Sequence, residues 1–448
     1  MAKKKQQFIV KHCKISIIVL AVVFPTIIFG QPKADSLLSH ATLENCIHYA
    51  LKNNPAIKNS VINEAIVETT IKSKLSEWYP QLSFTYNLQD NFQLPEINID
   101  GNLIKSGTNG TSSGQFGLTQ NIFSSDALLA SRSAKDVRIQ AKQSTKEQNI
   151  NLAAMVSKAF YDLILTKQQI LIAQEDITRL EQSLKDATYQ YQAGITDKTD
   201  YKRATISLNN AKALKNADDE TLKAKNAYLK ELMGYPDSLA FDLVYDTTQL
   251  SNEIYIDTLQ SVNYDNRIEI NLLETQRELQ EYNLKYYKWS YLPAISAFGN
   301  YNLNYLNNNF SKLYSVAYPN SYAGLLLTLP IFQGGKRIQQ IKQAQLEIVQ
   351  VDNSIKSLQN NINTQYQQAM AVYKSNLYNY LALKENVDLA SEVYDIISFQ
   401  YRNGVKTYLD VITAETDLRT AQTNYYNALY QLLSSKIDVL QSLGNITY

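Results

Sequence analysis

The stretch KRIQQIKQAQLEIVQVDNSIKSLQNNINTQYQQAMAVYKSNLYNYLALKENVDLASEVYDIISFQYRN fills residues 336–403, between Gly335 and Gly404, without a glycine or a proline. Globular helices usually have about three turns, so this stretch predicts a far longer helix, which would rise ~105 Å over about 70 residues. Such a helix needs a neighbour for its apolar stripe. The stripe steps by three and four residues: Ile341, Ala344, Ile348, Val351, Ile355, Leu358 and Ile362. This heptad spacing predicts left-handed coiled-coil packing.

Single glycines separate the stretches that lack helix breakers. No glycine or proline interrupts the chain from Gly404 to Gly444, from Gly117 to Gly194, or from Gly194 to Gly234. The segment after Gly404 repeats the heptad stepping at Tyr426, Tyr430, Leu433, Ile437 and Leu440. We therefore predict two hairpins of long antiparallel helices, with tight turns at Gly194 and Gly404.

The sequence is duplicated. Four landmarks recur in the same order, about 210 residues apart. They are Trp78–Leu82 with Ser290–Ala294, Gln120–Phe123 with Leu329–Phe332, Tyr191–Ile195 with Tyr401–Val405, and Leu232–Gly234 with Ser442–Gly444. We predict one repeat over residues 42–236, a linker over 237–256 and a second repeat over 257–448.

Each repeat also contains two segments in which apolar and polar residues alternate, as in strands with one wet face. In the first repeat they are 81–93 and 112–123, separated by a loop rich in Gly, Ser, Asn and Thr; in the second they are 294–306 and 320–331. Their lengths suit tilted transmembrane strands, although a soluble sheet of short hairpins is an alternative. An exported chain without an apolar helix enters lipid only as a closed barrel. Because the smallest barrels have about eight strands, membranous strands would require several copies.

The N-terminus predicts export. Lys3, Lys4, Lys5, Lys11 and Lys14 precede the apolar run Ile15–Phe29, which has the length of a secretory signal and is short for a membrane span. We expect a signal peptide over residues 1–30, followed by an N-terminal lead over 31–41. A retained anchor helix is the alternative.

The composition excludes several kinds of chemistry. Beyond residue 48 there is no histidine or cysteine, and the chain has only His12, His40, His48, Cys13 and Cys46. A zinc site or a histidine-based triad needs more such residues close together. We therefore expect no catalytic residues, no metal and no cofactor. The net charge of +1 does not favour nucleic acid.

The order of the motifs resembles that of the TolC-like outer-membrane efflux protein family over essentially the whole mature chain. Asn53–Ile57 and Asn266–Ile270 are similar to the family's Asn-Arg-Pro-Glu-Ile helix start, although the second copy lacks the proline. Leu329–Gly335 resembles its strand-to-helix junction, and Tyr401–Val411 resembles its periplasmic turn. The first junction, Thr119–Ser124, is a looser match.

The resemblance implies a mainly α fold with a small β part. Long antiparallel coiled-coil hairpins would form a tunnel, and four transmembrane strands per subunit would contribute to a shared barrel. It also implies a homotrimer in the outer membrane, with the tunnel in the periplasm. The expected partners are outer-membrane lipid, a periplasmic adaptor (membrane fusion) protein and an inner-membrane transporter.

In both predicted turns an aspartate follows the glycine by six residues: Asp200 follows Gly194, and Asp410 follows Gly404. By the resemblance, these acids would ring a periplasmic gate and favour cations. The family's second acid is replaced here by Thr413, so a double ring is not expected. The alternative role is helix capping, since Asp197 and Thr407 stand three residues before the two acids.

The remaining candidates also come from the turns. Tyr401 and Lys406 resemble family residues that tie the closed tip, with a solvated helix end as the alternative. For contact with an adaptor we expect the tip residues Gly194, Ile195, Thr196, Gly404 and Val405; ordinary turn chemistry is the alternative. Aromatic side chains that could form interfacial girdles are Tyr86, Phe92, Tyr301, Tyr305, Tyr314, Tyr318 and Tyr322.

The sequence thus predicts an outer-membrane channel subunit that exports small molecules or proteins. The main alternative is a periplasmic coiled-coil scaffold or adaptor without a membrane barrel. The duplication and the four alternating segments favour the channel.

Overall fold

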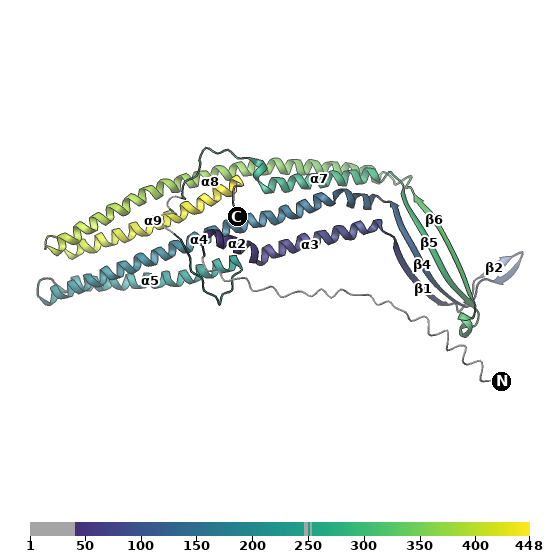
Figure 1. Cartoon of the computed structure of the whole chain (residues 1–448), viewed down its shortest axis with the longest axis horizontal. Coiled ribbons are helices and arrows are strands. Elements are labelled where there is room, and N and C mark those ends of the chain that lie inside the picture. The colour runs from purple at the N-terminus through teal and green to yellow at the C-terminus, as the bar shows by residue number, and fades with distance from the viewer. Residues whose placement is uncertain (1–40, 246–249, 251–252) are drawn as a thin grey trace, which may run out of the picture. The chain divides into compact units, whose positions relative to one another are not determined.

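Two long helical hairpins and one four-stranded sheet make up most of the described chain (Figure 1). The computed structural model describes residues 41–245, 250 and 253–448, all within the unit His40–Tyr448. The predicted signal peptide at 1–30 and most of the lead at 31–41 lie outside these residues.

The first hairpin consists of α4, Ser125–Gln192, with 68 residues, and α5, Lys198–Met233, with 36. The second consists of α8, Lys336–Arg402, with 67 residues, and α9, Tyr408–Leu443, with 36. The predicted uninterrupted helices and the turns at Gly194 and Gly404 are confirmed. Both turn glycines have positive φ, 73° and 77°, which is the conformation that glycine adopts most easily.

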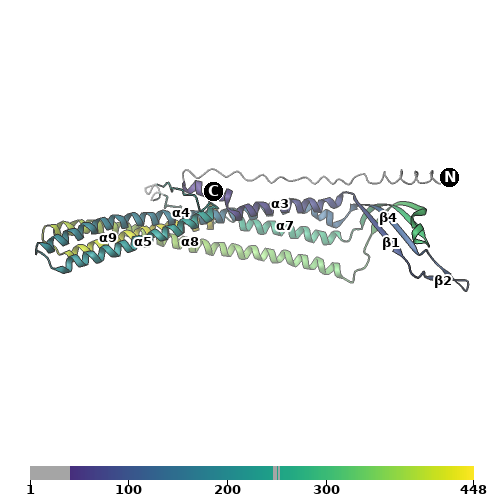
Figure 2. The same cartoon turned by 90° about the horizontal axis from the view of Figure 1, so that it is seen from below.

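The two hairpins pack on each other through α4 and α9 (Figure 2). The predicted heptad stripe of α8 lies in the part of the helix that packs on α7, Ile268–Trp289, where Arg277 Nε lies 2.6 Å from Asp352 Oδ1. Ala344, Val351 and Ile362 are buried, and the other stripe residues of α8 are half-buried. On α9, Leu433 and Ile437 are buried in the same way. The predicted apolar seams are therefore confirmed.

Shorter helices extend each hairpin toward the sheet: α2, Leu43–Asn53; α3, Pro55–Leu75; and α7, Ile268–Trp289. Asn54 caps α3 by accepting a hydrogen bond from Ala56 N at 2.7 Å, and Pro55 occupies the first turn. Arg267 precedes α7 without a side-chain cap, so the second helix start is the less strongly fixed one.

In both repeats, the end of the shorter hairpin helix, α5 or α9, is bonded to the residue that precedes α3 or α7. Asn54 Nδ2 donates to Leu232 O at 2.8 Å, and the guanidinium of Arg267 donates to Ser442 O at 2.8 Å. Gly234 and Gly444 follow these helices with φ of 65° and 73°. A Cβ at Gly234 would lie 2.8 Å from Asn53 O, and one at Gly444 would lie 2.7 Å from Asn266 O. Both positions therefore require glycine.

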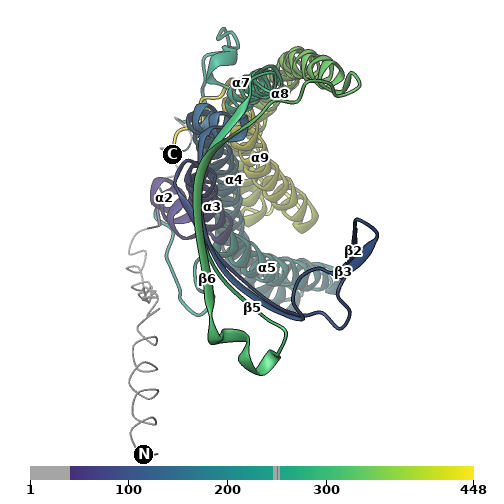
Figure 3. The same ribbon diagram turned by 90° about the vertical axis from the view of Figure 1, so that its right-hand side faces the viewer.

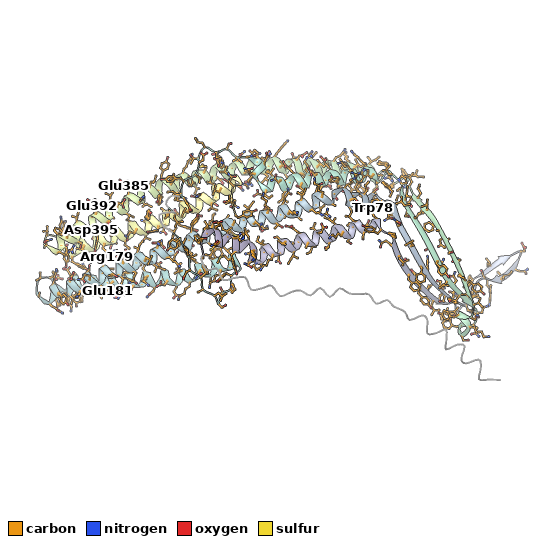
Figure 4. All side chains as sticks on the ribbon, viewed as in Figure 1. Trp78, Arg179, Glu181, Glu385, Glu392 and Asp395 are labelled. Atoms are coloured by element: carbon orange, nitrogen blue, oxygen red, sulfur yellow. The ribbon has the colours of Figure 1, made fainter. Side chains whose placement is uncertain are left out.

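The sheet lies at the opposite end of the unit from the helical turns (Figure 1), and Figure 3 shows the unit from the sheet end. Its order is β1-β4-β5-β6, and every neighbouring pair is antiparallel. The strands are β1, Gln81–Asp90; β4, Gly110–Phe123; β5, Ala294–Asn307; and β6, Ala317–Thr328. Each repeat contributes two adjacent strands. The indole of Trp78, marked in Figure 4, anchors the first junction by donating to Ser131 Oγ at 2.9 Å.

Several strand boundaries differ from the prediction. The first strand ends at Asp90 rather than at residue 93. Asn91 N donates to Asn109 O at 2.7 Å, and the chain then bends at residues 92 and 93. The last strand occupies Ala317–Thr328 rather than 320–331. Pairing with β5 extends the strand back to Ala317. Pro330 has no N–H to donate to a neighbouring strand, so the predicted extension to residue 331 is not favoured. The segment from Gly101 to Gly114, predicted as a loop, contains strand β3, Asn102–Lys105, and also the first residues of β4. Strand β3 pairs with β2, Glu96–Ile99, in a separate two-stranded sheet.

The two faces of the four-stranded sheet differ in polarity. The register places one set of apolar residues of neighbouring strands on one face: Leu82, Phe84, Tyr86, Leu118, Phe116, Tyr301 and Leu303. Tyr318 and Tyr322, which were expected in the aromatic girdle, lie instead on the opposite face, because Tyr322 pairs with Asn300 and Tyr318 with Asn304. On the other face, Gln115 Nε2 donates to Asn300 Oδ1 and Asn302 Nδ2 donates to Asn320 Oδ1, both at 2.8 Å. Across these four strands, all of which are described, Asp90 is the only charged residue.

The described part of the linker is fastened to the second hairpin by tyrosines of α8. Tyr373 Oη donates to Ile254 O at 2.8 Å and accepts from Ile256 N at 3.3 Å. One heptad earlier, Tyr366 Oη donates to Gln260 O at 2.5 Å. Lys436 of α9 donates to the carbonyl of Glu253.

Candidate functional site: the helical turns

The first turn places two acids at the start of α5. Asp197 is the N-cap and accepts from Thr199 N at 2.5 Å. Hydrogen bonds from the side chain and from the backbone N–H of Thr199 lower the pKa of Asp197. Asp200 lies in the first helical turn, where burial and then the neighbouring Asp197 raise its pKa. The two carboxyls of this turn are therefore shifted in opposite directions.

The second turn ends in a capping box. Asp410 N donates to Thr407 Oγ1 at 3.4 Å, and Asp410 Oδ2 accepts from Thr407 N at 2.9 Å. Thr407 Oγ1 also donates to Asp410 Oδ2, at 2.8 Å. The backbone and hydroxyl bonds from Thr407 to the carboxylate, together with the nearby Lys406, lower the pKa of the exposed Asp410. The capping role that the sequence offered as an alternative is confirmed for Thr407 and for Asp197.

Tyr401 connects the two hairpins near their turns. Its hydroxyl donates to Gln190 Oε1 of α4 at 2.9 Å. Its ring lies 5.7 Å from that of Tyr408, which is buried with Ala187 and Ala204 of the first hairpin. Burial and then Asp200 raise the pKa of Tyr401. Lys406 lies instead beside Asp410 of its own hairpin. Of the two residues predicted to close the tip, only Tyr401 therefore bonds to the other hairpin in the structure.

The tips themselves carry exposed apolar side chains. Ile195 is 73% exposed and Val405 is 71% exposed. A Cβ at Gly194 or at Gly404 would meet nothing within 4 Å. Thr196 differs from these residues, because its hydroxyl oxygen is buried and lacks a hydrogen-bond partner among the described residues. The tips are thus open surfaces with an apolar residue at each.

Thr413, which takes the place of the family's second acid, lies on the exposed side of α9. Its hydroxyl donates to Leu409 O of its own helix at 2.9 Å. A hydroxyl engaged in this way supplies no negative charge, so the acid at this turn remains Asp410.

Farther along the same helices lies a buried ionic cluster that the sequence prediction missed. Asp176 and Arg179 come from α4, and Glu415 and Arg419 come from α9. Arg419 Nη1 lies 3.4 Å from Asp176 Oδ2, and Arg179 Nε lies 3.6 Å from Glu415 Oε1. Arg179 Nη2 lies 3.5 Å from Asp176 Oδ1. The cluster therefore connects the two repeats through four charged groups.

A signal for this cluster is present in the sequence. Tyr408, Val411, Glu415 and Leu418 step by three and four residues and form the buried face of α9. Glu415 is the charged member of this apolar stripe, and a charged residue is almost never fully buried unless it is paired. A search for acids at seam positions, rather than near glycines, would have found it.

Two findings hold for residues 41–245, 250 and 253–448. No helix there is long and apolar enough to cross a membrane. No group of three or more histidine, cysteine, aspartate or glutamate residues there could hold a metal ion.

The comparisons with known proteins agree with this geometry. The model of the outer membrane efflux protein family matches residues 46–235 and 265–445. Outer membrane protein TolC of Escherichia coli strain K12 is 23% identical over 437 residues, covering 92% of this chain and 84% of that protein. The crystal structure of VceC from Vibrio cholerae has a TM-score of 0.70 at 13% identity and covers 90% of this chain and 96% of VceC. The open state of MtrE from Neisseria gonorrhoeae has a TM-score of 0.67 at 18% identity, covering 90% of this chain and 88% of MtrE.

Two hairpin repeats, each contributing half of one four-stranded sheet, are the fold of outer-membrane channel proteins. The chain belongs to the outer membrane efflux protein family. It is an outer-membrane transport protein, as the sequence predicted. The alternative of a periplasmic scaffold or adaptor is not supported by these relatives.

Proposed function

We propose that three copies of this chain form one passive export duct, energised by an inner-membrane transporter and joined to it by a periplasmic adaptor protein. The observation that carries the proposal is the open four-stranded sheet. Its outer strands β1 and β6 each pair on one side only within the described chain. Three copies would supply twelve strands, enough for a closed barrel.

The two faces of the sheet support this arrangement. A barrel in lipid presents apolar side chains outward and polar side chains to its lumen. The face containing Leu82, Phe84 and Tyr301 suits lipid, and the amide-rich face suits a water-filled passage. Tyr86 Oη and Tyr314 Oη lie 2.6 Å apart, and the Tyr314 ring lies 5.1 Å from that of Tyr305. This group supports an aromatic girdle at the strand ends.

The helices would continue the passage into the periplasm. A helix of 68 residues rises about 100 Å. At the far end we assign the gate to Asp200 and Asp410, tip closure to Tyr401 and Lys406, and adaptor contact to Gly194, Ile195, Thr196, Gly404 and Val405. The exposed Ile195 and Val405 support the adaptor assignment, since an exposed apolar tip suits a helical partner.

The duct would work by passage rather than by catalysis. MtrE is described in an open state, and we propose that this chain likewise opens when its hairpins separate near the turns. The cargo, whether small molecules or proteins, would be selected mainly by the transporter.

Planar-bilayer recording tests the channel. The full-length protein, purified from outer membranes in detergent, should give discrete conductance steps with cation preference. Cross-linking from a photoreactive residue at Val405, carried out in cells, should capture an adaptor, while the same residue at the exposed Asp417 should capture much less. Recovery of the chain only in the soluble periplasmic fraction, without conductance, would refute the proposal.

A further inference from the structure

The buried cluster between α4 and α9 lies away from the turns and from the sheet. Glu415 is 11 residues beyond Gly404, or about 16 Å along the helix, and Asp176 is 18 residues before Gly194, or about 27 Å. Figure 4 marks Arg179, on the α4 side of the cluster. The cluster is therefore a second point of contact between the hairpins, separate from Tyr401.

The carboxyl groups of the cluster are buried, whereas the arginine side chains are partly exposed to solvent. Asp176 is 0% exposed and Glu415 is 3% exposed. The side chains of Arg179 and Arg419 retain 25% and 27% of their exposure. Among the described residues, neither carboxyl oxygen of Glu415 has a hydrogen-bond partner. A buried carboxylate that lacks hydrogen bonds is costly, and taking up a proton relieves that cost.

Every element packed around Glu415 contributes a charged or titratable group. From α4 it faces Asp176 and Arg179, from α8 Tyr394, and along its own helix Arg419 and Tyr408. Asp200 of α5 acts on Tyr408. Burial is the largest influence on Glu415 and Asp176 is the next; together they outweigh the two arginines and raise its pKa to about 7.

We propose that Asp176, Arg179, Glu415 and Arg419 form a proton-dependent clamp that holds α9 against α4, and that loss of the proton from Glu415 loosens it. The proposal rests on the proposed channel function, because a looser clamp would ease separation of the hairpins. It adds an internal regulator that responds to protons and lies away from the adaptor-binding tips.

The direction follows from proton linkage. Glu415 holds its proton more tightly in the packed hairpins than it would when exposed to water, where the ordinary pKa is 4.5. The packed arrangement is therefore favoured at acidic pH and loses this contribution as the pH rises from about 4.5 to about 7. Between pH 5.5 and 7.5 the equilibrium should shift toward separated hairpins by roughly tenfold or more per copy.

Hydrogen exchange measures the clamp without requiring conductance. In the full-length protein in detergent, we expect protection factors for peptides spanning residues 173–183 and 411–422, corrected for intrinsic exchange, to fall by about tenfold from pH 5.5 to 7.5. Glu415→Gln, which stays neutral, should keep the acidic protection at both pH values. Asp417→Asn, an exposed neighbour on the same helix, should behave like the wild type. An unchanged wild-type profile, or an unchanged pH dependence in Glu415→Gln, would overturn the clamp.

Bilayer recordings then separate the clamp from the channel. If the protein conducts, its open probability should rise with pH in the wild type and in Asp417→Asn, and should remain low in Glu415→Gln. Conductance with the same pH dependence in all three proteins would overturn the clamp and leave the channel intact. If exchange follows Glu415 but no protein conducts, the proposed channel function fails and the clamp stands.

Discussion

The acids at the turns and the acids between the hairpins are the same chemical groups in contrasting surroundings. Asp410 is exposed, and hydrogen bonds from Thr407 lower its pKa. Glu415, only five residues farther along the same helix, is buried, and its pKa is raised to about 7. The comparison teaches that position relative to the helical seam, rather than distance from the turn, decides whether an acid on α9 remains charged near neutral pH.

Removing a charge from the buried cluster should have the largest effect on stability. Arg179→Met keeps the apolar stem but leaves Asp176 and Glu415 with less compensation, which should cost about 3 kcal/mol near pH 7.5. The measurement is thermal unfolding of the protein in detergent. Lys223→Met is the matched control, since its pair with Glu220 is exposed on both sides and should cost under ~0.5 kcal/mol. Equal losses in the two variants would erase the contrast between buried and exposed pairs.

The two glycines that flank α9 offer a second contrast between an exposed and a closely packed position. Gly404 and Gly444 have similar φ, 77° and 73°. A Cβ at Gly444 would lie 2.7 Å from Asn266 O, whereas one at Gly404 would meet nothing within 4 Å. We expect Gly404→Ala to cost about 1 kcal/mol from backbone strain, and Gly444→Ala to cost about 1 kcal/mol more because the close contact must also be relieved. Comparable unfolding temperatures for the two variants would contradict the fold at the repeat ends.

Loss of the cap at the second turn should have a smaller effect. Thr407→Ala removes the hydroxyl that Asp410 N bonds and should cost about 1 kcal/mol in chemical unfolding at pH 7. Because the folded-state pKa of Asp410 is lowered, the contribution of its carboxylate disappears as the pH falls through that pKa. Thr413→Ala, whose hydroxyl bonds its own helix, should be within ~0.5 kcal/mol of the wild type. If Thr407→Ala left the free energy of unfolding unchanged, capping by Thr407 would not stabilise this turn.

The smallest expected change concerns cation block of the channel. Asp410→Asn and Asp200→Asn should each weaken block by multivalent cations several-fold in bilayers. Asp200 has a raised pKa and Asp410 a lowered one. As the pH falls, the Asp410→Asn channel should therefore lose its remaining block at a higher pH than the Asp200→Asn channel. Block that is unchanged in both variants would leave Asp410 with capping alone and would remove Asp200 from the gate.

The long helices could be predicted because their signal is local and repeated. Glycine alone interrupts the long helical stretches, and the heptad seam of Ile341 to Ile362 is visible in the sequence and is buried or half-buried in the structure. The β2–β3 hairpin was missed because its strands have only four residues each, although Asp100-Gly101 between Ile97 and Leu103 is a hairpin signal. The offset of β6 was missed because the ends of a strand depend on its pairing with the neighbouring strand, here β5, and the residues of β6 alone do not reveal that pairing.

The candidate site could be predicted only where a turn marked it. Asp200, Asp410 and Tyr401 were found beside glycine landmarks. Asp176 and Glu415 lie outside the turn motifs and come together only because α4 packs on α9. That contact joins residues of the two repeats, and single-helix periodicity does not reveal which residues of α4 oppose those of α9.

We propose that neighbouring copies pair the two open edges of the sheet, and disulfide trapping can detect this pairing. In a Cys46→Ser background, Ser83→Cys on β1 would be combined in turn with Asn320→Cys, Tyr322→Cys, Gly324→Cys or Leu326→Cys on β6. Within one chain β4 and β5 separate these strands by about 14 Å, too far for a disulfide. Oxidation of the outer-membrane protein should give covalent dimers and trimers for at least one pair. Monomers alone from all four pairs, in protein that is correctly folded and inserted, would contradict it.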